Sequence, residues 1–232
     1  MRFLDIASSF ATSVVRLGAG RTVRGVAARP DKRLELYEFE ACPFCRKARE
    51  EFSRLDLEAI VYPCPKRGTR YRPGIVERGG KAQFPYLVDP NTGAEMYESN
   101  EIARYLSDTY GDGSRSIGSR LGLLNDVASV FAGMPRAARG VTVRPSRAPD
   151  QPLELWSYEA SPFSRLVRER LCELEIAYLL HNIGKGSARR PALIERAGKM
   201  QVPYLYDPNT GAEMFESAEI LDYLELAYAV AE

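Results

Sequence analysis

The pattern of hydrophobic and polar positions along the chain predicts a series of short elements. From Leu34 to Phe39 apolar and polar side chains alternate, which is typical of a half-buried strand. Pro43 is well placed in the first turn of a helix that runs to about Leu55, and the apolar run over 57–62 indicates a second strand. The remaining predicted elements are a short helix near 74–78, strands over 86–88 and 95–97, and a final helix over 100–110.

The last two predicted strands form a hairpin whose turn spans residues 89–93. Gly93 at the end of this turn can adopt a positive φ angle. Ser99 is expected to cap the final helix, with Glu101 in its first turn. The resulting order, β-α-β-α-β-β-α, resembles the thioredoxin-like arrangement with a mixed four-stranded sheet.

The same pattern occurs a second time in the chain. DPNTGAEM stands at 89–96 and again at 207–214. LELYEFEACPFCR, from Leu34, is matched by LELWSYEASPFSR, from Leu153, and the spacing between matched blocks changes by only one residue. Such self-similarity indicates a duplication. We therefore predict an α/β protein of two tandem thioredoxin-like domains.

Each repeat is preceded by a stretch with helical spacing of apolar residues, over 4–17 and over 123–131. The N-terminal stretch is rich in arginine and resembles a targeting peptide, but a cleaved peptide has no reason to recur in mid-chain. Both helices are therefore expected to belong to the folded unit. A segment rich in glycine and serine at 111–120 marks the boundary. The predicted domains are residues 1–112 and 113–232.

Composition and charge narrow the functional classes. Hydrophobic residues make up 45% and charged residues 27% of the chain, which is ordinary for a globular protein. Lys+Arg 32 against Asp+Glu 31 gives a net charge of +1, so nucleic acid and membrane surfaces are not expected partners. No segment is apolar and long enough to cross a membrane. The four cysteines do not form a secreted disulfide framework, which favours a reducing, cytoplasmic location.

The first candidate site is the cysteine pair in Cys42-Pro43-Phe44-Cys45, at the predicted junction of a strand and a helix. Free backbone N–H groups and the helix dipole stabilise a thiolate at this position. Arg46 and Lys47 are expected to add positive charge there. Cys42 is thus the predicted nucleophile, and Cys45 the thiol that resolves a mixed disulfide. The alternative, half of a zinc site, lacks a second Cys or His pair.

The CPFC motif, Gln83-Phe84-Pro85 and Glu98-Ser99 together resemble the glutathione-binding domain of glutathione S-transferases and the related glutaredoxins. The resemblance implies that Pro85 is cis and faces Cys42, and that Phe84 and Pro85 hold the glutathione backbone. It also implies that Glu98 and Ser99 bind the γ-glutamyl end, with Gln83 as a further candidate. In the second copy the equivalent residues are Gln201, Val202, Pro203, Glu216 and Ser217. The helical second domain of the transferases has no expected counterpart.

The second copy has Ser161-Pro162-Phe163-Ser164 in place of the cysteine motif, so it cannot form a disulfide there. Two interpretations remain open. Ser161 activates a glutathione thiol, as serine-type transferases do, or this copy is a structural or docking partner.

Other polar residues receive simpler predictions. Cys172 is expected in the core and His181 at the surface. Cys64 lies next to prolines after a strand, a position that allows exposure, and nothing assigns it chemistry. Three arginines, Arg189, Arg190 and Arg196, suggest a solvated basic face.

The leading prediction is a glutathione-dependent thiol–disulfide oxidoreductase acting through Cys42 and Cys45, with glutathione as cosubstrate. Its partner is a disulfide or a glutathionylated protein or small molecule. The alternatives are a non-catalytic binding or scaffold module, a serine-type glutathione transferase using Ser161, and a glutathione-ligated iron–sulfur cluster. The sequence leaves open the physiological substrate, the oligomeric state and the orientation of the two domains.

Overall fold

The computed structural model describes Ser9 and residues 19–114 and 139–230. The helices expected over 4–17, apart from Ser9, and over 123–131 lie outside these residues. The expected boundary segment is described only as far as residue 114.

The described residues contain the predicted order of elements twice. The first repeat consists of β1 (Leu34–Glu38), α2 (Pro43–Arg54), β2 (Ala59–Pro63), α3 (Arg72–Gly79), β3 (Tyr86–Asp89), β4 (Ala94–Met96) and α4 (Ser99–Tyr110). The second consists of β5 (Leu153–Ser157), α7 (Pro162–Glu173), β6 (Tyr178–Asn182), α8 (Arg190–Ala197), β7 (Tyr204–Asp207), β8 (Ala212–Met214) and α9 (Ser217–Tyr228). The predicted thioredoxin-like α/β fold is therefore confirmed.

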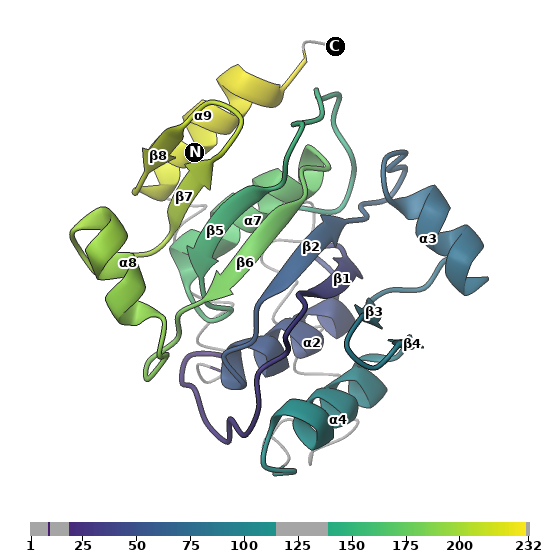
Figure 1. Cartoon of the computed structure of the whole chain (residues 1–232). Helices are drawn as coiled ribbons and strands as arrows, with labels where there is room; N and C mark the ends of the chain where they lie inside the picture. The colour runs from purple at the N-terminus through teal and green to yellow at the C-terminus, as the bar shows by residue number, and fades with distance from the viewer. Residues whose placement is uncertain (1–8, 10–18, 115–138, 231–232) are drawn as a thin grey trace.

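The two repeats share one eight-stranded sheet, with strand order β4-β3-β1-β2-β6-β5-β7-β8 (Figure 1). Within each repeat the first two strands are parallel and the hairpin strands are antiparallel to them or to each other. The repeats join where β2 runs antiparallel to β6, with Ala59 opposite Leu180 and Val61 opposite Tyr178. The order reads the same from either edge, so a pseudo-two-fold axis passes between β2 and β6.

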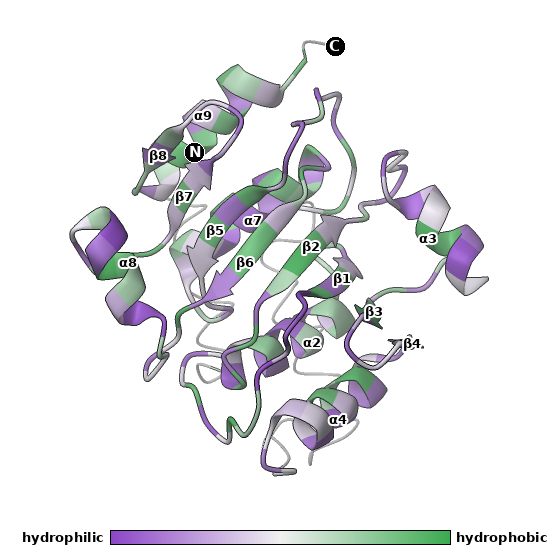
Figure 2. Ribbon diagram, in the orientation of Figure 1, coloured by the Kyte–Doolittle hydropathy of each residue, from purple (hydrophilic) through white to green (hydrophobic). Residues whose placement is uncertain are grey.

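The hydrophobic core of each repeat lies between its strands and its long helices. Leu34 and Leu36 on β1 pack with Phe52 on α2 and Leu106 on α4, and all four are fully buried. Burial of each such side chain contributes about 1.5–3 kcal/mol to folding. The second repeat repeats this core, and Val61 of β2 is part of it. Figure 2 shows hydrophobic residues along β2 and β6, where the repeats meet.

Segments that precede each repeat pair with the other repeat. The Val23 N–H donates to the Lys185 carbonyl at 2.9 Å, and the Lys185 N–H donates to Arg21 at 2.7 Å. In the same way the Lys66 N–H donates to the Val141 carbonyl at 2.7 Å. These isolated β-bridges, each between the segment that precedes one repeat and a loop of the other, connect the two repeats outside the sheet.

The expected role of Ser99 as a helix cap is wrong. Helix α4 begins at Ser99 itself, and Glu98 is the cap residue, with φ 65° and no side-chain hydrogen bond to the helix. Glu216 has the same role in the second repeat, with φ 50°. Because the chain turns at the glutamate in both copies, the serine is already within the first helical turn.

Candidate active site

Cys42 occupies the N-cap of α2, four residues beyond the end of β1 at Glu38. Its φ and ψ angles, −70° and 122°, are those of extended backbone, and Pro43 begins the helix. The Cys42 Sγ accepts a hydrogen bond from the Cys45 N–H at 3.3 Å. The sulfur therefore takes the position that serine and aspartate side chains often occupy at a helix start. This is the placement that the sequence predicted.

The environment of Cys42 favours its thiolate. A hydrogen bond from the Cys45 side chain, together with the backbone N–H groups of Cys45 and Phe44, lowers the pKa of Cys42 to about 7, against the effect of burial. The positive charge of Arg49 acts in the same direction. Cys42 can therefore be substantially ionised near neutral pH.

Cys45 has the opposite properties. It is completely buried. Burial raises its pKa well above the usual range, and the hydrogen bond and charge of Cys42 raise it further. One thiol of the pair is thus activated and the other is held in its protonated form, which suits a nucleophile and a resolving thiol.

Arg46 and Lys47, which were expected to add positive charge in the first turn, contact residues other than the cysteines. The Arg46 Nε lies 3.8 Å from Glu159 of the second repeat, and the Lys47 Nζ donates to Asn100 at 2.6 Å. Arg49, one turn further along the helix, is the cation whose charge lowers the pKa of Cys42.

The Phe84–Pro85 peptide bond is cis, and so is Val202–Pro203 in the second repeat. The Cys42 thiol points at this loop, with its Sγ 3.9 Å from the Phe84 carbonyl oxygen. Phe84 is buried among Cys42, Cys45 and Cys64, and the Arg72 guanidinium lies over its ring at 4.6 Å. The structure thus brings the predicted nucleophile and the predicted peptide-binding loop together.

The other predicted glutathione-binding residues form a second group. The Gln83 side chain donates a hydrogen bond to the exposed carboxylate of Glu98. The same pair recurs in the second repeat, where Gln201 Nε2 donates to Glu216 Oε1 at 2.5 Å. Ser99 and its counterpart Ser217 are buried in the first turns of α4 and α9.

The second copy keeps the geometry of the site without its sulfurs. Ser161 is the N-cap of α7, and its Oγ accepts a hydrogen bond from the Ser164 N–H at 3.2 Å. Ser9, from the N-terminal part of the chain, contacts this helix start. Its Oγ donates to the Pro162 carbonyl at 2.7 Å, and Arg165 donates to the Ser9 carbonyl at 2.8 Å.

The remaining two cysteines are both buried. Cys172 is in the core, as predicted, and its Sγ lies 3.4 Å from the Gly140 carbonyl oxygen. Cys64, for which the sequence allowed exposure, is instead fully buried beside Cys42 and Cys45. Burial raises the pKa of the Cys64 thiol far above its usual range. None of the four cysteines is in a disulfide.

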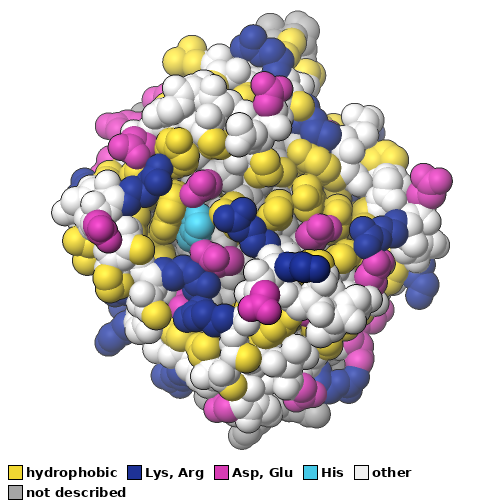
Figure 3. Space-filling model, viewed as in Figure 1, with side chains coloured by type: hydrophobic (Ala, Val, Ile, Leu, Met, Phe, Trp, Pro, Cys, Tyr) yellow, Lys and Arg dark blue, Asp and Glu magenta, His cyan; other side chains and the backbone are white. Residues whose placement is uncertain are grey.

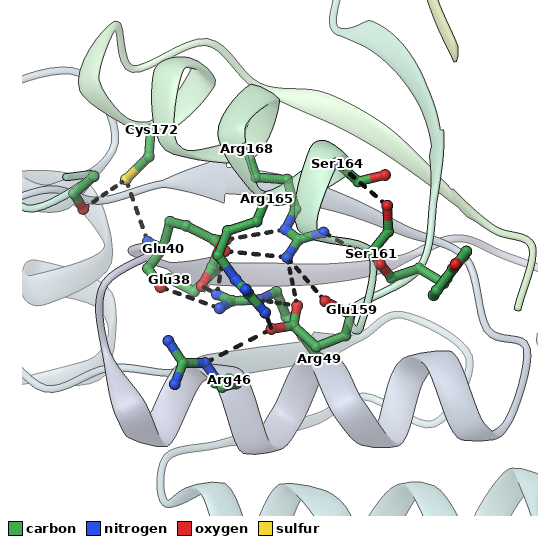
Figure 4. Close-up of polar contacts among 12 residues, drawn as sticks. Glu38, Glu40, Arg46, Arg49, Glu159, Ser161, Ser164, Arg165, Arg168 and Cys172 are labelled. Carbon is green, nitrogen blue, oxygen red and sulfur yellow. Dashed lines mark hydrogen bonds and ion pairs between the residues drawn. The ribbon is translucent and has the colours of Figure 1, made fainter. Parts of the chain in front are cut away.

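Where the two repeats meet lies a buried group of charged residues that the sequence did not predict (Figure 4). Four of its members form a ring across the pseudo-two-fold axis. Arg49 Nε contacts Glu159 Oε2 at 2.9 Å, Arg168 contacts the same oxygen at 2.8 Å, and Arg168 also contacts Glu40 at 3.1 Å. Arg49 closes the ring on Glu40 at 3.3 Å. Arg168 and Arg49 outweigh the effect of burial and lower the pKa of Glu159 to about 2.

Glu38 adds a further carboxylate to this group. Its carboxylate accepts a hydrogen bond from Arg49 Nη1, and its side chain is buried. The sequence did contain a signal. In the alternation of β1, Glu38 falls on the same side as the core residues Leu34 and Leu36, where a charged residue requires a partner.

His181 lies at the surface, as expected, although it is only partly exposed, and Arg189 does not belong to the solvated basic face that was predicted for it. His181 lies at the junction of the repeats, with Nδ1 2.5 Å from Glu58 and Nε2 3.0 Å from Glu154. It is the cyan side chain on the face in Figure 3. Arg189 contacts Glu58 at 2.9 Å and Asp56 at 3.1 Å. Most of the residues that His181 and Arg189 contact belong to the first repeat. The sequence of the second repeat alone therefore could not predict these contacts.

The other two arginines, Arg190 and Arg196, contact residues of the second repeat instead. Arg190 Nε donates to the Gly184 carbonyl at 2.9 Å. The Arg196 guanidinium lies over the Tyr206 ring at 4.2 Å and remains partly exposed. A freely solvated basic face therefore does not form from these three residues.

The described part of the chain has neither a membrane span nor a metal centre. Within it, no helix combines the length and apolar character needed to span a membrane. No group of three or more His, Cys, Asp or Glu side chains in that part is arranged to hold a metal ion.

Comparison with known proteins gives the class of the protein. The model of the glutathione S-transferase N-terminal domain family matches residues 36–115 and again residues 155–231. The two matches together cover more than half of the chain, so the chain belongs to this family, and it contains the domain twice. No curated protein matches the chain.

Two solved glutathione transferases are similar to the chain. The Bombyx mori enzyme BmGSTD1 is 24% identical, over 36% of this chain and 38% of its own, with a TM-score of 0.32. Leishmania TDR1, described as a unique trimeric glutathione transferase, is 14% identical over 86% of this chain and 68% of its own, with a TM-score of 0.30. The chain thus spans well under half of the length of the Bombyx enzyme.

Proposed function

We propose that the protein is a glutathione-dependent thiol–disulfide oxidoreductase in which only the first repeat carries out the reaction. The observation that carries this proposal is the N-cap position of Cys42, with a pKa of about 7 and its Sγ 3.9 Å from the Phe84 carbonyl. The family match supports glutathione as the ligand.

The reaction begins when the Cys42 thiolate attacks one sulfur of a disulfide that contains glutathione. A new S–S bond joins Cys42 to glutathione, and the partner leaves as a thiolate that takes a proton from water. Cys45 then loses its proton and attacks the Cys42 Sγ, which releases glutathione and leaves a Cys42–Cys45 disulfide. Two further glutathione molecules reduce this disulfide and leave as oxidised glutathione. Electrons thus pass from glutathione to the substrate.

The burial of Cys42 bears on the substrate. Only 3% of the residue is exposed, whereas the neighbouring Phe44 is 45% exposed. A thiol in this position is reached by a slender, peptide-like disulfide more easily than by a bulky one. We therefore infer that glutathione enters the site first, as the glutathionyl part of a mixed disulfide.

The second repeat is assigned a structural role under this proposal. Ser161 and Ser164 cannot form a disulfide. Glu159 and Arg168 of this repeat contact Arg49 and Glu40 of the first repeat. The alternative, that Ser161 activates glutathione as in a serine-type transferase, is tested by the same experiment, described next.

The test compares glutathione-dependent reduction of a small mixed disulfide by the wild type with the variants Cys42→Ser and Ser161→Ala. Cys42→Ser is expected to lose activity by roughly 10³-fold or more, because the nucleophile is absent. Ser161→Ala changes the equivalent position of the second repeat and is the matched control, expected to keep wild-type turnover.

Full turnover by Cys42→Ser contradicts the proposal. Loss of activity in Ser161→Ala, together with conjugation of a generic electrophile by the wild type, favours the transferase alternative. An ordinary Cys42 pKa without any turnover favours a non-catalytic module.

A further inference from the structure

The turn that leads into the cysteine helix is held in part by the other repeat. Residues 39–42 connect β1 to α2, and the Cys42 N–H donates to the Phe39 carbonyl at 3.0 Å across this turn. Glu40 lies within the turn and is only 2% exposed. Because a buried carboxylate requires bonded partners, the contacts of Glu40 fix the position of the turn.

Glu40 is bonded to α7 of the second repeat through both its carboxylate and its N–H (Figure 4). The Arg168 guanidinium binds the carboxylate as a fork, with Nε 3.1 Å from Oε2 and Nη2 3.1 Å from Oε1. The Glu40 N–H donates to the Cys172 Sγ at 3.4 Å. From its own repeat, Arg49 donates to the Glu40 carbonyl at 3.1 Å, and Arg49 Nη1 lies 3.3 Å from the carboxylate. Cys42 therefore follows, by two residues, a point that the second repeat holds.

The corresponding turn of the second repeat has the matching contacts, so the exchange is mutual. Glu159 in that turn donates its N–H to the Ser53 Oγ of α2 at 3.0 Å. Its carboxylate contacts Arg49 Nε, also on α2, at 2.9 Å. Each helix thus holds the turn that precedes the other helix. The motif after the second turn contains serines in place of both cysteines, so the exchange bears on thiol chemistry in the first repeat alone.

The position of the first turn decides how the Cys42 thiolate is stabilised. The Cys42 Sγ accepts from the Cys45 N–H at 3.3 Å and lies 3.9 Å from the Phe84 carbonyl oxygen. The ionisable side chains that act on it are Cys45 and Arg49. A hydrogen bond weakens steeply when its angle departs from linear. A turn that α7 no longer holds therefore stabilises the thiolate less.

We propose that Arg168 of the second repeat is a positioning residue for the Cys42 nucleophile of the first. Its guanidinium fork holds Glu40, and Glu40 holds the turn in the position that directs the Cys42 Sγ to the helix start. The second repeat, which has no thiol at its own helix start, thus completes the active site of the first. The inference rests on the proposed function in taking Cys42 as the reacting thiol.

The experiment measures the rate at which iodoacetamide alkylates Cys42 as a function of pH, with mass spectrometry to locate the adduct. It compares the full wild-type chain with Arg168→Lys, which keeps the positive charge but cannot form the fork, and with Arg168→Met, which keeps neither. Both variants are expected to react about 10-fold more slowly than the wild type at about pH 6, because a smaller fraction of Cys42 is ionised. At about pH 9.5, where the thiolate is formed in all three proteins, their rates should converge.

Two further variants form a matched pair. Cys172→Ala removes the acceptor of the Glu40 N–H in the active-site turn, and Ser53→Ala removes the acceptor of the Glu159 N–H in the turn of the second repeat. Cys172→Ala is expected to slow alkylation of Cys42 at about pH 6 in the same direction as the Arg168 variants, but by less, because a sulfur acceptor is weak. Ser53→Ala is expected to lower the thermal stability and to keep the wild-type pH profile.

A wild-type profile in Arg168→Lys overturns the proposal, because the fork would then have no role beyond its charge. Slowing in Ser53→Ala equal to that in Arg168→Lys also overturns it, because any loosening of the joint would then have the same effect. If Arg168→Met does not fold, the buried Cys45 and Cys64 are alkylated as well, and Arg168→Lys with Cys172→Ala decides the question. Wild-type profiles in both of these contradict the proposal.

The proposed function can fail separately, because alkylation of Cys42 requires no glutathione. A wild type that reduces no glutathione mixed disulfide contradicts the oxidoreductase, while slower alkylation in the Arg168 variants still supports the positioning role. An active wild type whose Arg168 variants keep its alkylation profile contradicts the positioning role alone.

Discussion

At the scale of single residues, the two sulfurs of the first repeat differ in their hydrogen bonds more than in their burial. Cys42 is 3% exposed and Cys45 is 0% exposed, yet the pKa of Cys42 is lowered and that of Cys45 is raised. At Cys42 the hydrogen bonds that the Sγ accepts at the helix start outweigh burial, whereas at Cys45 burial is the largest cause and the hydrogen bond to Cys42 adds to it. The helix geometry thus decides which of the two thiols has the lowered pKa.

Cys45→Ala is expected to raise the pKa of Cys42, because the Cys45 side chain makes the largest contribution that lowers it. The backbone N–H of residue 45 remains, so only part of the effect should be lost. The pH dependence of alkylation at Cys42, followed by mass spectrometry, measures this. Cys45→Ser keeps a donor and is the control, expected to shift the pKa less. Identical profiles for the wild type and Cys45→Ala would show that the side-chain bond has no role.

The sequence predicted where the two thiols lie but not the buried charged group. Cys42 and Cys45 were recognisable because two thiols at this spacing, placed at a helix start, are typical of redox chemistry. Arg49 and Glu159 are far apart in the chain and meet only because the two repeats share a sheet. Their pairing therefore could not be predicted from either repeat alone.

At the scale of elements, one aspartate in each repeat connects the hairpin to the last helix through hydrogen bonds. Tyr105 and Tyr110 of α4 both donate to Asp89 Oδ2, at 2.6 Å and 2.5 Å. Asp207 accepts the same pair of bonds from α9, from Tyr223 and Tyr228. Burial opposes ionisation, but these tyrosine hydrogen bonds bring the pKa of Asp89 and of Asp207 below the usual range.

Tyr110→Phe is expected to destabilise the protein by about 1.5–3 kcal/mol, the usual value of a buried hydrogen bond to a charged group. The substitution keeps the ring and removes only the bond to Asp89. Tyr228→Phe is the matched change in the second repeat and should give a loss of similar size. Urea unfolding followed by circular dichroism measures both. A loss well below about 1 kcal/mol in both variants would mean that the aspartate is satisfied without the tyrosine.

The elements themselves were largely predictable, because the duplication gave two independent sequences for each one. The strand at 34–39 and the helix from Pro43 were placed within about a residue of β1 and α2. The start of α4 was misplaced, because a serine before an acidic first turn is the usual cap signal. Glu98, with its positive φ angle, is the cap residue instead of Ser99, and nothing in the residue type predicts this angle.

At the scale of the whole molecule, the two repeats are held together by strand pairing, by isolated β-bridges between the segment that precedes each repeat and the other repeat, and by buried ion pairs. In an isolated repeat β2 is an edge strand, and an apolar edge strand tends to pair with another chain. Pairing with β6 covers this edge. The apolar run Tyr178–Leu180 on β6, buried throughout, was the available sequence signal for such a partner. It did not specify which strand the partner would be.

The joint between the repeats is expected to weaken as pH rises, because His181 bridges Glu58 of one repeat and Glu154 of the other. Burial opposes the charged imidazolium, but the hydrogen bonds and charges of both carboxylates raise the pKa of His181 above its usual ~6.5. A raised folded-state pKa contributes stability that is complete below the unfolded value and is lost as pH passes the folded value. The free energy of unfolding of the wild type should therefore exceed that of His181→Gln near pH 5.5, and the difference should shrink by about pH 8.5. Urea titrations at the two pH values measure this difference. The control is Tyr62→Phe, because Tyr62 is the equivalent residue of the first repeat and the substitution keeps it aromatic. This variant is expected to show no such trend with pH. A difference that stays constant or grows with pH would mean that His181 is neutral in the folded protein and that Arg189 is the cation that holds Glu58.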